Sequence, residues 1–254
     1  MPLTPSASTP TPQDAPRYYA LVPCAGAGSR AGTARPKQYQ TVAGQPLVMH
    51  TLWALAGVAR LHAGLVVLSP GDDFAWPQGL QWPPRFSRAS CGGESRAHSV
   101  FNGLQALREA GARDHDWVLV HDAARCLITP ALVDALIDAC ADDAVGGLLA
   151  LPLPDTLKRA VDGRVAATVP REDKWLAQTP QMFRLGALQQ ALAAQAPSGF
   201  AGVTDEASAL EMAGLQPLLV VGSAHNFKVT YPQDFALAQA VLNSRSSIPN
   251  KEHP

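Results

Sequence analysis

The chain has 254 residues, of which 47% are hydrophobic and 16% charged, and its formal net charge is -1 at pH 7. This length suits one globular α/β domain, and the near-zero charge provides no overall field for nucleic acid or an anionic membrane, so phosphate recognition must be local. Because the chain has no long apolar run and no CxxC pair, we expect a cytoplasmic protein without membrane spans, disulfides or structural zinc.

The two ends of the chain differ from the rest. Residues 1–17 are rich in Pro, Ser and Thr and lack the apolar core of a secretory signal, which predicts a disordered tail. An organelle-targeting segment is the weaker alternative, because basic residues are nearly absent there. Residues 18–244 are predicted to form a single domain, and residues 245–254 a short C-terminal tail.

The first half of the domain alternates between apolar runs and helical patterns. A buried strand is predicted over residues 18–23, and the Gly-rich stretch 24–32 is the loop after it. Ser95 is a good N-cap for a following helix. In chain order, the pattern then predicts a helix over 46–61, a strand over 64–70, a helix over 95–110, a strand over 117–121, a helix over 130–141 and a strand over 146–152.

The second half begins with two short extended pieces over residues 155–169, around the turn signal Asp162-Gly163. We expect them to project as a β-arm spanning about 152–175. Thr204 is expected to cap a helix that ends near Gly214, followed by strands over 216–221 and 227–230 and a helix over 232–243. This order predicts an α/β fold: a mainly parallel twisted sheet with helices on both faces and ligands beyond the carboxyl ends of the strands.

The Gly-rich loop over residues 23–31 fits the dinucleotide fingerprint GxGxxG/A only loosely. That fingerprint also needs an acidic residue about twenty positions further on, but no Asp or Glu occurs between Asp14 and Asp72. A Walker phosphate loop is excluded as well, since Lys37 follows Pro36 and precedes Gln38. The pattern therefore disfavours both a dehydrogenase and a P-loop enzyme.

The same acid-free stretch carries five basic residues: Arg17, Arg30, Arg35, Lys37 and Arg60. Small residues with free backbone N–H groups beside such cations form a cradle that suits a triphosphate. The alternative is a Gly-rich turn with solvated basic side chains.

Asp122 follows the apolar run WVLVH at the predicted carboxyl end of a strand. It is a candidate magnesium ligand or ribose contact, because Mg²⁺ often uses one carboxylate together with substrate phosphates. The alternative is an Asp that caps a turn. Imidazole is a poor ligand for Mg²⁺, so we assign His121 and His225 no catalytic role.

The chain contains seven motifs in this order: PCAGAGSR, RPKQY, CGGESRAHSV, HDAAR, QTPQ, TDEASALE and HNFKVTYPQD. Together they resemble the 2-C-methyl-D-erythritol 4-phosphate cytidylyltransferase family over about residues 19–242. The resemblance implies a Rossmann-like nucleotidyltransferase fold and a homodimer clasped by β-arms, with active sites shared across subunits. It also implies a Mg²⁺-dependent reaction of CTP with methylerythritol phosphate, which gives 4-diphosphocytidyl-2-C-methyl-D-erythritol and pyrophosphate in isoprenoid precursor biosynthesis.

The resemblance also implies roles for individual residues. Three cations would grip the triphosphate and the transition state: Arg30, Lys37 and Lys228. CTP would be held by Cys24, Ala25, Gly26, Ala27, Gly28, Gly93, Glu94, Ser99 and Asp122, with Asp122 also the metal ligand. The second substrate would be held by Arg125, Thr156, Arg171, Thr179 and Thr204, of which Thr156 and Arg171 would reach a neighbouring subunit. A solvated surface amine is the alternative for Lys37 and Lys228.

Two motifs depart from the usual pattern of the family. Cys126 follows HDAAR where Pro is common, and the usual GGDER reads Gly92-Gly93-Glu94-Ser95-Arg96. These changes affect the local loop shape. The competing hypotheses are a ribitol 5-phosphate cytidylyltransferase, which would share the CTP site, and a nucleotide-binding relative without catalysis, which would be expected to lack the phosphate-gripping cations.

Overall fold

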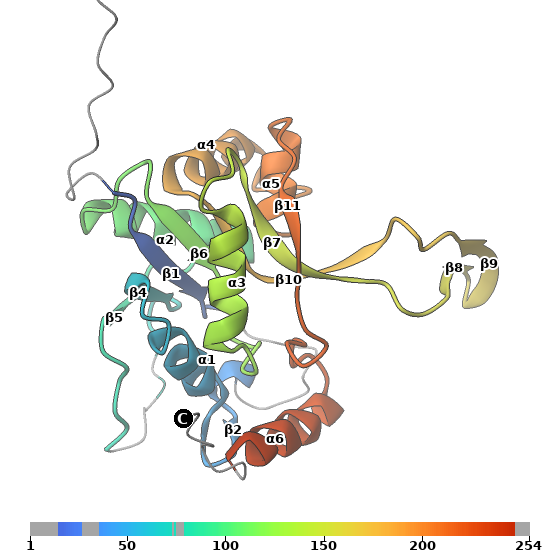
Figure 1. Cartoon of the computed structure of the whole chain (residues 1–254), viewed down its shortest axis with the longest axis horizontal. Coiled ribbons are helices and arrows are strands. Elements are labelled where there is room, and N and C mark those ends of the chain that lie inside the picture. Colours follow the sequence, from blue (N-terminus) through green and yellow to red (C-terminus); the bar gives the residue numbers. More distant parts are fainter. Residues whose placement is uncertain (1–14, 27–35, 73, 75–78, 247–254) are drawn as a thin grey trace, which may run out of the picture.

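The computed structural model describes residues 15–26, 36–72, 74 and 79–246. Within these residues the centre of the molecule is a sheet in the order β11-β7-β10-β6-β1-β4-β5 (Figure 1). Strand β10 runs antiparallel to its neighbours β6 and β7, and the other pairs are parallel. The prediction of a mainly parallel sheet is confirmed. The strand bounds are β1 Tyr18–Pro23, β4 Leu61–Val67, β5 Phe86–Ala89, β6 Trp117–Val120, β7 Gly146–Pro152, β10 Trp175–Arg184 and β11 Leu218–Val221.

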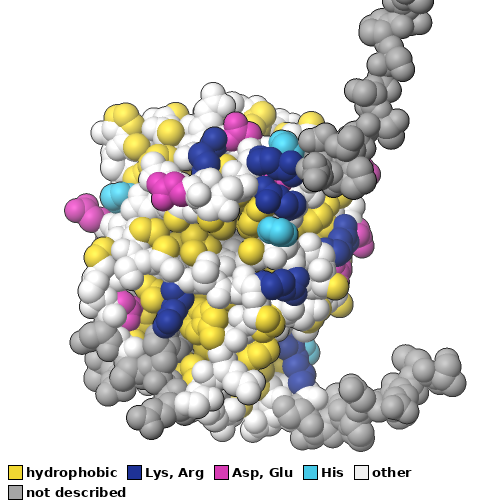
Figure 2. Space-filling view, turned by 90° about the vertical axis from the view of Figure 1, so that its left-hand side faces the viewer, with side chains coloured by type: hydrophobic (Ala, Val, Ile, Leu, Met, Phe, Trp, Pro, Cys, Tyr) yellow, Lys and Arg dark blue, Asp and Glu magenta, His cyan; other side chains and the backbone are white. Residues whose placement is uncertain are grey.

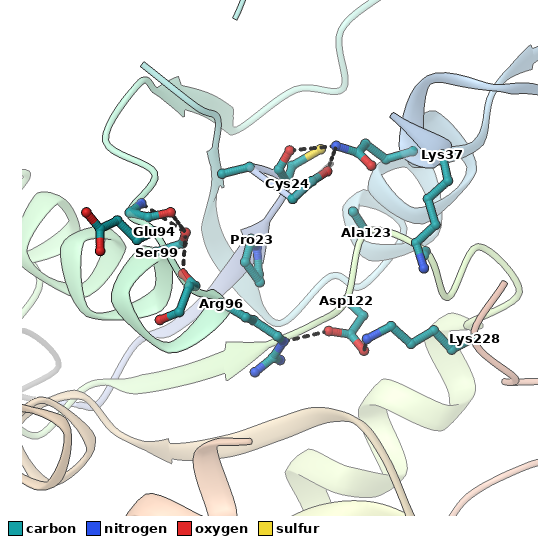
Figure 3. Close-up of a pocket in the computed structure, with 15 residues that line it drawn as sticks. Pro23, Cys24, Lys37, Glu94, Arg96, Ser99, Asp122, Ala123 and Lys228 are labelled. Atoms are coloured by element: carbon teal, nitrogen blue, oxygen red, sulfur yellow. Dashed lines mark hydrogen bonds and ion pairs between the residues drawn. The ribbon is translucent and has the colours of Figure 1, made fainter. Parts of the chain in front are cut away.

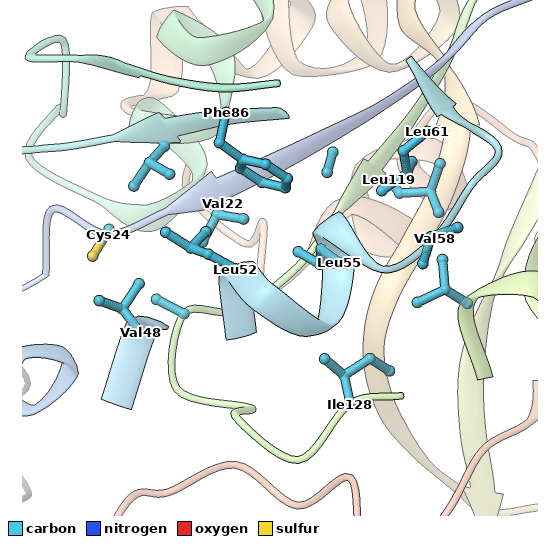
Figure 4. Close-up of a cluster of buried hydrophobic side chains, with 14 of the residues drawn as sticks. Val22, Cys24, Val48, Leu52, Leu55, Val58, Leu61, Phe86, Leu119 and Ile128 are labelled. Carbon is cyan, nitrogen blue, oxygen red and sulfur yellow. The ribbon is translucent and has the colours of Figure 1, made fainter. Parts of the chain in front are cut away.

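Helices cover both faces of this sheet, as predicted. Alternate residues of β1 point to opposite faces: Ala20 and Val22 pack with α1 and α3, whereas Tyr19 and Leu21 pack with α2, α4 and α5. Figure 4 shows the first of these cores, with α1 lying against the sheet. The helix bounds are α1 Leu47–Ala56, α2 Arg96–Glu109, α3 Pro130–Cys140, α4 Leu185–Gln195, α5 Glu206–Met212 and α6 Pro232–Ser246.

Short elements complete the described chain. A 3-10 turn, η2 (Lys37–Tyr39), leads into the small hairpin of β2 (Thr41–Val42) and β3 (Gln45–Pro46), and a second 3-10 turn, η3 (Ala196–Ser198), follows α4. None of the helices in the described part of the chain combines the length and apolarity that crossing a bilayer requires. On the side shown in Figure 2, basic, acidic and apolar side chains are interspersed, in keeping with the near-zero net charge.

Helix capping agrees with the sequence at one site and differs at another. Ser95 caps α2, because its hydroxyl accepts a hydrogen bond from the His98 N–H at 3.1 Å. Helix α5 is capped by Asp205 and not by Thr204, so that prediction was wrong by one residue. Asp205 accepts from the Ser208 N–H at 2.9 Å and Ser208 bonds back to the Asp205 N–H, a capping box that Thr204 could not form from one position earlier.

Two predicted boundaries need correction. The helix predicted over 46–61 ends at Ala56, and the next strand starts at Leu61 rather than 64. Leu55, Val58 and Leu61 are all buried, so the apolar pattern runs through the helix end without a break.

The predicted strand over 227–230 does not exist in the structure. Its backbone groups pair elsewhere: the Val229 N–H donates to Ala124 O, and the Thr230 N–H donates to the Asp234 carboxylate at the start of α6. Helix α6 packs against Val229 through Ala238. The segment is therefore a loop that is held by Ala124 and by the start of α6.

The predicted arm is present. Strands β8 (Leu157–Val161) and β9 (Arg164–Val169) form a hairpin that projects from the ends of β7 and β10 (Figure 1). Asp162 and Gly163 both have positive φ, as a type I′ turn requires. Most arm side chains are exposed, so little within this chain stabilises the hairpin.

Candidate active site

A cleft of about 280 Å³ lies at the carboxyl ends of β1 and β6. These strands are parallel neighbours, so the segments that follow them meet at one edge of the sheet, where α/β sheets bind ligands (Figure 3). Nine of the predicted site residues line this cleft: Cys24, Ala25, Gly26, Lys37, Gly93, Glu94, Ser99, Asp122 and Lys228. The predicted residues Ala27, Gly28 and Arg30 lie outside the described residues.

The first wall of the cleft is the loop after β1. Gln38, which is buried, donates from Nε2 to Cys24 O and to Gly26 O, both at 2.9 Å. The Ser69 hydroxyl donates to Ala25 O at 2.8 Å. Gln38 belongs to the motif RPKQY, but the sequence predicted no role for it. The structure shows that it fixes the loop's carbonyl groups.

The second wall runs from Gly92 to Ser99. A Cβ atom on Gly92 would lie 2.4 Å from the Cβ of Ala25, so glycine is required for the two walls to meet. The Gly93 N–H donates to Ser99 Oγ at 3.0 Å, and that hydroxyl donates to Ser95 O at 2.9 Å. Ser99 therefore shapes the loop from within, and the Gly93 peptide borders the cleft.

Asp122 lies between Arg96 and Lys228 at the floor of the cleft (Figure 3), and Arg125 approaches the same carboxylate. Arg96 Nε donates to Oδ1 at 2.9 Å, and Lys228 Nζ lies 2.9 Å from Oδ2. Arg125 Nε is 3.5 Å from the same Oδ2. Burial would raise the pKa of the Asp122 carboxyl, but these cations outweigh burial and hold the pKa far below its usual range. Asp122 is thus a carboxylate at every physiological pH.

A buried hydrogen-bond chain supports Asp122 from below. The Asp122 N–H donates to Thr179 Oγ1 at 3.0 Å, and that hydroxyl lies 3.0 Å from His121 Nδ1. His121 Nε2 lies 3.2 Å from Arg125 O, a carbonyl that can only accept, so Nε2 carries the proton and Nδ1 accepts from Thr179. Thr179 and His121 are buried and support the Asp122 backbone from within the protein, and the predicted contact of Thr179 with the second substrate stays a prediction.

The buried position of His121 in this hydrogen-bond network predicts that the stability of the fold depends on pH. Burial lowers the pKa of His121 to about 4, whereas the pKa of a histidine in the unfolded state is about 6.5. The folded state therefore binds fewer protons than the unfolded state between these values, and stability is lost as the pH falls from 6.5 toward 4. We expect the free energy of unfolding, measured in urea at a series of pH values, to fall with decreasing pH in the wild type. The slope of this fall should be shallower in His121→Gln. Equal slopes in the two proteins would rule out His121 as the cause.

The basic cradle predicted from the sequence is only partly assembled. Lys37 borders the cleft and is half-buried, and its Nζ donates to Val229 O at 2.8 Å. Arg17 and Arg60 do not line the cleft: Arg17 pairs with the buried Asp116, and Arg60 pairs with Asp138 on the surface. Arg35 lies outside the described residues.

The predicted residues for the second substrate are dispersed. Arg125 donates to Asn226 O at 2.7 Å and to Ala177 O at 3.2 Å, behind Asp122. Thr204 is exposed at the start of α5. Thr156 and Arg171 lie on the arm, which extends away from the body of the same chain (Figure 1).

The donor set fits Mg²⁺ better than a transition metal. Among the described residues, no group of three His, Cys, Asp or Glu side chains could hold a metal ion. The cleft does offer Asp122, a carboxylate beside the predicted phosphate cradle, and Mg²⁺ commonly needs only one or two protein carboxylates besides phosphate oxygens and water.

A mainly parallel α/β sheet, a Gly-rich loop after its first strand, and a cleft with an acid among cations are features expected of a nucleotidyltransferase. The family model "IspD: 2-C-methyl-D-erythritol 4-phosphate cytidylyltransferase" matches residues 18–244, and the chain belongs to this family. The family resemblance and fold predicted from the motifs are confirmed.

Several relatives are similar over most of the chain. The "Bifunctional enzyme IspD/IspF" of Albidiferax ferrireducens is 62% identical over 238 residues, which are 94% of this chain and 56% of that protein, so the chain spans about half of this longer relative. The 2-C-methyl-D-erythritol 4-phosphate cytidylyltransferase of Chromobacterium violaceum is 55% identical over 89% of this chain and 98% of that protein.

Solved structures agree with these relatives. A crystal structure of 4-diphosphocytidyl-2C-methyl-D-erythritol synthase has a TM-score of 0.76 at 38% identity, covering 89% of this chain and 98% of that one. The 2-C-methyl-D-erythritol 4-phosphate cytidylyltransferase of Francisella tularensis has a TM-score of 0.75 at 31% identity, covering 88% and 99%.

Proposed function

We propose that this chain transfers the cytidylyl group of CTP to 2-C-methyl-D-erythritol 4-phosphate and releases pyrophosphate. The observation that carries the proposal is the convergence of Lys37, Lys228 and Asp122 on one cleft in a member of this family. None of the relatives and structures reported above is named for ribitol 5-phosphate, so we do not favour that alternative. The cations of the cleft also argue against a relative that binds nucleotide without catalysis.

The reaction needs positioning and charge neutralisation more than proton transfer. The attacking group is a phosphate oxygen that is already ionised at neutral pH, so no side chain has to remove a proton. In-line attack on the α-phosphorus concentrates negative charge on the phosphate oxygens and on the departing pyrophosphate. Lys37 and Lys228 line the cleft in which we expect that charge to develop. A bound Mg²⁺ would supply further charge neutralisation, with Asp122 as its protein ligand.

The walls of the cleft are expected to hold the nucleotide. The loop from Cys24 to Gly26 is expected to lie beside the triphosphate, and the Gly93 peptide and Glu94 border the expected position of the cytosine. We also propose a cytoplasmic location, which the four unpaired cysteines support, because disulfides are rare in reducing compartments.

The most direct test is pyrophosphate release by the purified chain with CTP and Mg²⁺. The reaction is run with methylerythritol 4-phosphate, with ribitol 5-phosphate and with no acceptor. Release with the first acceptor alone supports the proposal. Release with ribitol 5-phosphate would favour the ribitol 5-phosphate cytidylyltransferase instead. No release with either acceptor would contradict both cytidylyltransferase hypotheses.

We further propose that the chain acts as a homodimer whose arms complete each other's sites. Thr156 and Arg171 cannot serve their own cleft while the arm extends from the body (Figure 1). The arm also exposes Val161 and Val165, and Trp175 and Leu176 are exposed at its base. Exposed apolar side chains on a projecting hairpin favour contact with another protein surface.

Subunit mixing tests this arrangement. We expect Lys37→Ala and Arg171→Ala each to be inactive alone, because one damages the cleft and the other the arm. A mixed dimer would contain one site with an intact cleft and an intact arm, so an equal mixture after subunit exchange should regain about one quarter of wild-type activity. No recovery in a mixture shown by light scattering to contain exchanged dimers would place Arg171 outside the partner's site.

A further inference from the structure

Glu206 is a buried carboxylate beside the cleft. It has no role in the mechanism proposed above. It is the first residue of α5, and only 1% of it is exposed. Both of its oxygens accept from one guanidinium: Arg96 Nη1 donates to Oε1 at 2.6 Å, and Arg96 Nη2 donates to Oε2 at 3.1 Å. Such a two-pronged pair is the strongest and most directional form of charge-assisted hydrogen bond.

Arg96 is thereby joined to two carboxylates at once. Its Nη atoms are held by Glu206, and its Nε donates to Asp122 Oδ1. Only one edge of the guanidinium therefore faces Asp122, and Oδ2 of Asp122 is directed to Lys228 at the cleft (Figure 3). The orientation of the Asp122 carboxylate depends on where Glu206 holds Arg96.

Glu206 is itself fixed to the central sheet. Gln181 of β10 accepts from the Ala207 N–H at 2.8 Å and donates to Asp205 Oδ2 at 2.9 Å, which anchors the first turn of α5. A rigid connection thus runs from β10 through Glu206 and Arg96 to Asp122. A buried carboxylate is costly unless it is paired, so Glu206 and Arg96 hold each other in one arrangement.

Glu206 also sets the charge balance at the site. Asp122 is surrounded by Arg96, Arg125 and Lys228, so a single carboxylate would face three cations. With Glu206 satisfying the Nη groups, Arg96 contributes only part of its charge to Asp122. Without Glu206, the guanidinium would be free to turn toward Oδ2 of Asp122 and to compete there with Lys228 and with any ligand in the cleft.

We propose that Glu206 is a positioning residue. By holding Arg96, it keeps the Asp122 carboxylate oriented toward the cleft and accessible to the Mg²⁺ that accompanies CTP. This inference rests on the proposed function, because it takes Asp122 as the protein ligand of that ion.

The test compares Glu206→Gln with Glu211→Gln in the full chain. The control makes the same chemical change at an exposed position of the same helix. Calorimetry measures CTP binding as the Mg²⁺ concentration is varied, and pyrophosphate release gives kcat. For Glu206→Gln we expect the Mg²⁺ concentration at half-maximal CTP binding to rise about 10-fold, and kcat to fall by a similar factor. The control should match the wild type.

A merely structural role would lower the melting temperature of Glu206→Gln and leave its Mg²⁺ requirement unchanged, and that result would overturn the inference. If Glu206→Gln does not fold, Arg96→Lys decides the question, because a single ammonium cannot span both carboxylates. It should raise the Mg²⁺ requirement similarly, and an unchanged requirement would overturn the inference. The calorimetric measurement of CTP binding does not require turnover. Inactivity of the wild type would therefore count against the proposed function and not against this inference.

Discussion

Asp122→Asn is expected to lower kcat/KM by roughly 100-fold or more, because it removes the carboxylate that pairs with Arg96, Lys228 and Arg125. The amide of Asn would also direct an NH₂ group toward one of these donors. The cations would then repel each other, and Lys228 would lose its partner in the absence of nucleotide. The loss should appear in pyrophosphate release at saturating Mg²⁺.

Asp138→Asn is the matched control for this change. Asp138 is an exposed carboxylate of α3 that pairs with Arg60 on the surface, away from the cleft. Exposed pairs contribute about 0 to 1 kcal/mol, so the control should retain wild-type activity and stability. Activity of Asp122→Asn within twofold of the wild type would remove Asp122 from both the metal-binding and the electrostatic role.

Lys37→Met should lower kcat by roughly 100-fold to 1,000-fold, the usual cost of losing one preorganised group that stabilises transition-state charge. The methionine keeps most of the aliphatic stem and removes the charge. The folded state loses the hydrogen bond from Nζ to Val229 O, and a hydrogen bond of this kind contributes about 1 kcal/mol. A large loss of rate with a small change in melting temperature therefore distinguishes a role in the reaction from a role in folding.

Arg60→Met serves as the control for Lys37. Both cations belong to the same acid-free stretch of sequence, but Arg60 pairs with Asp138 outside the cleft. Its loss should leave turnover unchanged. If the two variants have the same rate, the charge of Lys37 has no part in the reaction, and phosphate neutralisation would have to come from Lys228 and from residues outside the described part of the chain.

Much of the fold follows from local signals. The apolar run at residues 18–23 forms β1, Ser95 caps α2, and Asp162-Gly163 turns the arm hairpin, because each depends on a few neighbouring residues. One central element, β10, gave no usable local signal. The run that forms β10 contains Pro180 and three polar Gln and Thr side chains, yet it lies in the middle of the sheet, with a register shift between Ala177 and Gln181.

The sequence by itself determined the family, the order of most elements and nine residues of the cleft, since these reside in contiguous motifs. Only the tertiary structure decided which charges meet. It removed Arg17 and Arg60 from the cradle and joined Arg96 to Glu206 across 110 positions of sequence. Spacing carries no signal for such a pair, because ion pairs depend on distances that the packing of α2 and α5 on the sheet sets.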